Sequence, residues 1–100
     1  MSVYTDWHLE RLAKQLRTLF RDAADDWARG NNSGDPRLLE RYTDSCDRLR
    51  KQAEGLLAHH QIDVDYPGLN PTFTVVSTGR EYRDVLEALR ARHFPVEVSK

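Results

Sequence analysis

Apolar residues recur at helical spacing in two long stretches of the chain, residues 6–29 and 36–60. In the first stretch, steps of three and four place them on one broad face, as in a helix that packs against a core. These positions are Leu9, Leu12, Ala13, Leu16, Leu19, Phe20, Ala23, Ala24 and Trp27. The second stretch has a seven-residue repeat, the narrower seam of coiled-coil-like packing. Its positions are Leu39, Tyr42, Cys46, Leu49, Ala53, Leu56 and His60.

The residues around these stretches predict where the two helices begin and end. Thr5 and Asp6 can each accept hydrogen bonds from the free amides of a first helical turn. Gly30 suits the left-handed position after a helix end. Asp35 followed by Pro36 is typical of a cap and a first helical residue. The short link at 30–35 therefore predicts an antiparallel helical hairpin over residues 5–60.

After residue 60 the pattern changes to that of short strands. Residues 62–66 alternate apolar and acidic positions, as in a half-exposed strand. Residues 72–76 are rich in β-branched and aromatic types and predict a second strand. The turn residues at 67–71 between them allow an antiparallel pair.

The C-terminal third predicts a helix between strands. Thr78 and Glu81 have the spacing of a capping box, so residues 77–81 are expected to be a strand-to-helix turn. A third helix over 82–93 would bury Tyr82, Val85, Leu86 and Leu89, and residues 94–98 would form a last strand after a right-handed crossover. We therefore predict one α+β domain over residues 1–100, with the hairpin at 5–60. A small β-β-α-β or β-α-β unit at 61–100 would pack on it.

Composition excludes few function classes. The net charge of −1 gives no general attraction to nucleic acid or acidic lipid. Twelve arginines outnumber three lysines, which suits recognition surfaces but also follows from base composition, because the arginines are spread over all three helices. With a lone Cys46, no export signal at the start and no apolar run of membrane-spanning length, we expect a cytoplasmic protein that has no membrane partner.

Two clusters contain residue types that bind ligands. His59, His60, Asp63 and Asp65 are rich in metal-binding types, but adjacent histidines on a helix diverge by about 100°. We therefore predict no metal site and no cofactor. Backbone amides at the expected strand-to-helix turn could hold an anion. The residues of that candidate anion site are Thr78, Gly79, Arg80 and Arg83.

Catalysis and nucleic-acid binding find limited support. Cys46 occupies a core position of the seam and lacks a motif for nucleophilic chemistry. We therefore expect a protein that is not an enzyme, with a small helical enzyme that has an Arg-lined anion site as one alternative. A second alternative is a nucleic-acid-binding accessory protein that uses a basic stripe on the first helix. That stripe consists of Arg11, Lys14, Arg17 and Arg21.

The first helix also carries features typical of protein interfaces. Trp7 and Trp27 lie at its two ends, and Trp and Arg dominate binding hot spots. Asp22, Asp25 and Asp26 form an acidic cluster toward the C-terminus of the helix, where the dipole disfavours anions. The simplest explanation for this placement is a salt bridge to the second helix. We predict a small protein-binding module (an adaptor, inhibitor or accessory subunit, of bacterial or phage type) that self-associates in some cases. Its candidate residues are Trp7, Arg11, Lys14, Arg17, Arg21, Asp22, Asp25, Asp26 and Trp27.

Overall fold

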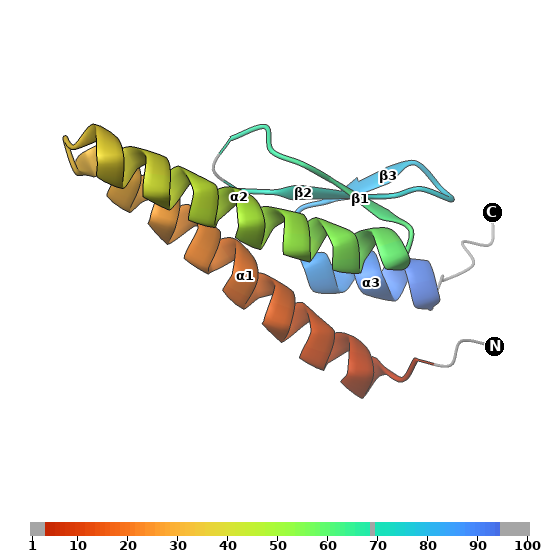
Figure 1. The fold of residues 1–100 in the computed structure, drawn as a ribbon. Helices are drawn as coiled ribbons and strands as arrows, with labels where there is room; N and C mark the ends of the chain where they lie inside the picture. The colour runs from red at the N-terminus through yellow and green to blue at the C-terminus, as the bar shows by residue number, and fades with distance from the viewer. Residues whose placement is uncertain (1–3, 69, 95–100) are drawn as a thin grey trace.

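A computed structural model of the chain describes residues 4–68 and 70–94. Two long helices, α1 (Asp6–Asn32) and α2 (Pro36–His59), come first. Strands β1 (Ile62–Asp65), β2 (Thr72–Val75) and β3 (Arg80–Tyr82) follow, and helix α3 (Val85–His93) comes last. The helices pack against the sheet, which confirms the predicted α+β class (Figure 1).

The helical hairpin is confirmed, with one correction at its tip. Thr5 caps α1 by accepting from the amide of His8, and Asp35 caps α2 by accepting from the amide of Arg37. Gly30 does not end α1, because the helix continues to Asn32. The left-handed residue is Gly34, with φ +68°, and the link shrinks to residues 33–35.

Gly30 has a packing role instead. It is buried where the two helices cross closely, and a Cβ built on it would lie 3.1 Å from the Cβ of Tyr42. The carbonyl oxygen of Leu39 would be 3.4 Å away. The glycine therefore permits close approach of α1 and α2 near the tip.

The three strands form an antiparallel sheet of order β1-β2-β3 within the described residues. Ile62 pairs with Val75 and Asp65 with Thr72, so the predicted pairing of the first two strands is confirmed. The strand-to-helix turn is wrong. Residues 76–79 form a tight connection, with Gly79 at φ +71°, and the chain then returns antiparallel to β2 as β3.

The third helix begins later than the sequence predicted. Its cap is Asp84, which accepts from the amide of Glu87, so the expected capping box of Thr78 and Glu81 is also wrong. Tyr82 belongs to β3 rather than to the helix. Of the last strand expected at 94–98, Phe94 lies in a bend after α3 and the other positions lie outside the described residues.

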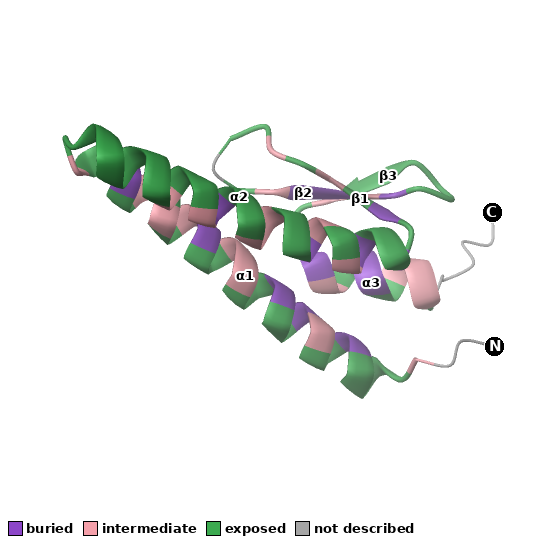
Figure 2. Ribbon diagram, in the orientation of Figure 1, coloured by how far each residue is buried: buried purple, intermediate pink, exposed green. Residues whose placement is uncertain are grey.

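One core joins the N-terminal half of α1, the C-terminal half of α2, the sheet and α3. Its fully buried members are Leu9, Ala13, Leu16, Ala53, Leu57, Ile62, Phe73, Val75, Val85, Ala88 and Leu89. The tip of the hairpin extends past the sheet, where burial is sparse (Figure 2). Among the described helices, none has the length and apolar character needed to cross a membrane.

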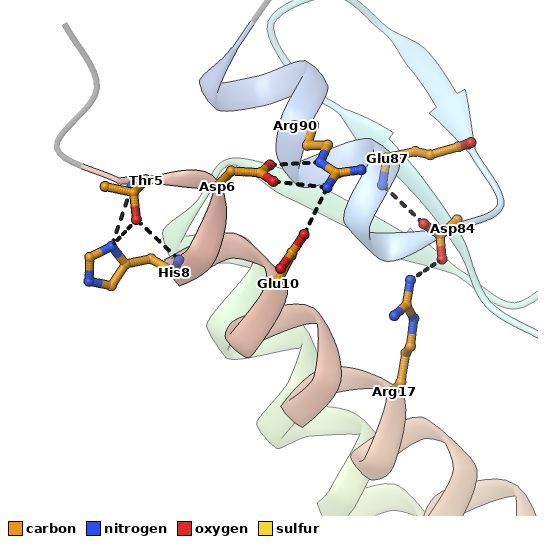
Figure 3. Close-up of polar contacts among 8 residues, drawn as sticks. All are labelled: Thr5, Asp6, His8, Glu10, Arg17, Asp84, Glu87 and Arg90. Carbon is orange, nitrogen blue, oxygen red and sulfur yellow. Dashed lines mark hydrogen bonds and ion pairs between the residues drawn. The ribbon is translucent and has the colours of Figure 1, made fainter.

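Ion pairs on the surface hold α3 along α1. The guanidinium of Arg90 contacts Asp6 at 2.8 Å and Glu10 at 3.2 Å, and Arg17 contacts Asp84 at 2.8 Å (Figure 3). Hydrogen bonding from Arg90 lowers the pKa of the Asp6 carboxyl below its usual value. Because these pairs are exposed, each adds little to stability.

Candidate functional site

A cleft of about 900 Å³ opens where α1 passes the end of the sheet. Arg17, Phe20, Arg21, Ala24 and Asp25 form the wall on α1. Residues of the β1–β2 connection and β2 form the opposite side, and the corner between β3 and α3 closes one end. A large concave surface of this kind is the default place to look for ligand binding.

Aromatic side chains form the apolar part of the cleft. The rings of Phe20 and Phe73 meet edge to face, with centroids 5.6 Å apart. Tyr66 lies behind Phe20 at 6.4 Å, and the guanidinium of Arg50 lies 4.5 Å over its ring. Burial, with a contribution from the nearby Glu54 carboxylate, raises the pKa of Tyr66. Phe20 therefore packs against Phe73 in the cleft and against Tyr66 behind it.

Some charged residues on the rim of the cleft form ion pairs and others do not. Arg17 is held by Asp84, which also caps α3. Partial burial opposes ionisation of Asp84, but the hydrogen bonds from Arg17 and the Glu87 amide lower its pKa overall. Arg21 and Arg83 make no ion pair within the described residues. The same holds for the acids Asp25 and Glu81.

The structure brings together only part of the predicted partner-binding set. Arg17, Arg21 and Asp25 line the cleft, while Arg11 and Lys14 line a separate, shallower groove further along α1. Trp7 is exposed by 57%, and the guanidinium of Arg11 lies 5.0 Å over its ring.

The remaining members lie toward the hairpin tip. Asp22 is exposed, and Trp27 is exposed by 40%. Asp26 contacts α2 through a 2.6 Å hydrogen bond from Ser45, and its ion-pair partner at 3.8 Å is Arg29 of its own helix. The expected salt bridge between the acidic cluster and α2 is therefore replaced by a hydrogen bond.

The four residues of the candidate anion site do not converge. Thr78 and Gly79 lie in the β2–β3 connection, Arg80 begins β3, and Arg83 lines the cleft. The N-terminus of α3 is occupied by the carboxylate of Asp84. The premise of the site, a helix that directly follows the turn at residues 77–81, is wrong, because α3 begins at Val85.

One member of the cluster His59, His60, Asp63 and Asp65 belongs to a buried histidine pair. His60 is 7% exposed, and its Nδ1 lies 2.8 Å from Nε2 of His93, with Tyr4 against both rings. Burial lowers the pKa of both imidazoles, and neighbouring positive charge adds to this effect. No group of three metal-capable side chains occurs in the described part of the chain. The sequence could not reveal this pair, because the residues that form the whole sheet lie between His60 and His93 in the sequence.

Phe20, Phe73 and Asp84 are the cleft residues that sequence reasoning missed as a group. The sequence pattern places Phe20 on the core face of the first helix and Phe73 in a strand, and Asp84 caps α3 six residues after Thr78, the cap that the sequence predicts. The enzyme and nucleic-acid alternatives stay predictions, because no contact described above tests them. No family model, curated protein or solved structure matches this chain.

Proposed function

We propose that this protein is a non-catalytic binding module whose cleft receives a segment of a partner protein. The observation that carries the proposal is the combination of an apolar floor, Phe20 and Phe73, with the uncommitted guanidinium groups of Arg21 and Arg83. An apolar centre with a polar rim that includes arginine is typical of protein interfaces.

The apolar surface of α1 continues beyond the cleft. Ala24 lines the cleft, and Trp27 follows it by three residues, which is close to one helical turn. A partner segment seated on Phe20 would therefore meet Trp27 next. The rim has both charge signs, so the proposed partner segment carries mixed charge around an apolar strip. Adaptors, inhibitors and accessory subunits bind in this way, and the lone buried thiol of Cys46 agrees with action in the reducing cytoplasm.

The proposal is tested by affinity capture from the native cell with three baits. These are the wild type, the cleft variant Arg21→Glu/Arg83→Glu, and a control variant Arg41→Glu/Arg48→Glu with the same charge change on exposed α2 positions. We expect a partner at stoichiometric yield on the wild type and the control, and its loss on the cleft variant. Equal capture by all three baits would place binding elsewhere and refute the cleft.

A further inference from the structure

The outer face of α1, opposite the core, carries a stripe with palindromic spacing. Steps of three and four residues separate its members, which therefore form one seam along the helix. The positions are 7, 11, 14, 18, 22, 25 and 29, and the order of the steps is the same in both directions from position 18. Its residues are Trp7, Arg11, Lys14, Thr18, Asp22, Asp25 and Arg29, and all of them are exposed. We call this set the outer stripe.

Charge along the outer stripe changes sign at its centre. The cations Lys14 and Arg11 precede Thr18 by four and seven residues. The anions Asp22 and Asp25 follow it by the same two intervals. None of these four charged groups makes an ion pair within the described residues.

We propose that the outer stripe is the interface for a second copy of this chain, with the two α1 helices antiparallel across a twofold axis at Thr18. A twofold axis there maps position 14 onto 22 and position 11 onto 25. Lys14 then faces Asp22 of the second copy, and Arg11 faces Asp25 of the second copy, each pair occurring twice. Trp7 comes opposite Arg29 of the second copy, a ring and guanidinium that attract each other.

The centre of the stripe suits a twofold axis. Thr18 is uncharged, and its hydroxyl already donates to the carbonyl of Lys14 at 3.1 Å, so no like charges and no free donor meet on the axis. Beside it lies the shallow groove on α1, about 570 Å³, with Leu12 and Leu19 in its lining. Leu12 and Leu19 give this otherwise polar groove an apolar surface for side chains of the second copy. The contact shares Asp25 with the wall of the cleft but uses neither the aromatic floor nor Arg21 and Arg83, so the inference stands apart from the proposed function.

Charge exchange gives the decisive test. We expect the wild type to sediment as a dimer at low salt and to dissociate at high salt, because the contacts are exposed ion pairs. Lys14→Glu alone, or Asp22→Lys alone, places like charges opposite each other twice and should weaken the dimer roughly tenfold. The double variant Lys14→Glu/Asp22→Lys restores complementarity and should dimerise again.

Mixing the two single variants sharpens this test. The Lys14→Glu chain is acidic at both positions and the Asp22→Lys chain is basic at both. Each should therefore dimerise more weakly than the wild type when alone, and the mixture should form heterodimers. Lys51→Glu on an exposed position of α2 is the control and should leave the dimer intact. A wild type that stays monomeric at low salt, or single variants that dimerise as well as the wild type, would overturn the proposal. So would failure of the mixture to associate when circular dichroism shows both chains folded.

Discussion

At the scale of single residues, the His60–His93 contact makes stability depend on pH. The two ring nitrogens lie 2.8 Å apart, so one must donate and the other accept. When both rings are protonated to imidazolium, neither nitrogen can accept and the contact breaks. Burial lowers the pKa of both imidazoles below their ordinary value of 6.5. Below that pH the unfolded chain binds more protons than the folded chain.

This difference in proton binding predicts how stability changes with pH. The free energy of unfolding should be highest above pH 6.5 and should fall as the pH drops from 6.5 through the lowered folded-state pKa values. Urea titrations at a series of pH values measure it. The His60→Gln/His93→Gln variant should flatten this part of the profile, whereas His59→Gln on the exposed neighbour should leave it in place. An unchanged profile in the double variant would contradict the assignment.

Two glycines of the hairpin make a matched pair of residue-scale predictions. Gly55→Ala meets no atom within 4 Å, so the better helix propensity of alanine should stabilise the protein by about 0.5–1 kcal/mol. Gly30→Ala gains the same propensity, but its new Cβ would lie 3.1 Å from the Cβ of Tyr42. A Cβ is fixed to the backbone, so it cannot rotate away from the contact. We expect no gain, or a loss, at position 30. Thermal unfolding of the two variants compares them, and an equal gain at both positions would contradict the close approach.

At the scale of elements, Asp84 joins α3 to α1 through two separate interactions. Its carboxylate accepts from the Glu87 amide at 3.2 Å and from Arg17 at 2.8 Å. Asp84→Ala loses the cap and should cost about 1 kcal/mol. Arg17→Ala removes only an exposed ion pair and should cost less than half as much. Asp84→Asn keeps a capping oxygen and should fall between the two. Denaturant midpoints rank the three variants, and a larger cost for Arg17→Ala would show that the ion pair dominates.

The elements also show what the sequence can and cannot predict. Periodicity identified α1, α2 and β1, because each buries one side in a regular pattern. Composition identified β2, which is rich in β-branched and aromatic residues and has both faces buried or partly buried. Strand β3 has no such pattern: Arg80 and Glu81 are exposed, and pairing with β2 rather than local preference makes it a strand. The cleft was out of reach for a related reason. Phe20, Phe73 and Arg83 become neighbours only after the sheet folds against α1.

At the scale of the whole molecule, core packing is unevenly distributed along the hairpin. The molecule extends 55 Å in its longest direction, and its main core lies at the end that holds the sheet and α3. Toward the tip, the fully buried residues between α1 and α2 are the small Ala23, Gly30 and Cys46. Leu38 and Leu39 are exposed by 38% and 40% there. The protein therefore combines a well-packed base with a lightly packed arm.

Uneven packing should give the two ends of the molecule different local stability. Backbone amides of the arm, residues 24–44, should exchange with solvent through local opening at lower free energy than those of residues 9–16 and 53–57. Leu16→Ala, at a fully buried position, should cost about 2–5 kcal/mol of global stability. Leu39→Ala should cost much less and act mainly on exchange in the arm. Native-state hydrogen exchange followed by mass spectrometry resolves both regions. If arm and base exchanged with one common free energy, the hairpin would unfold as a single unit, and its tip could not adjust locally to a partner at Trp27.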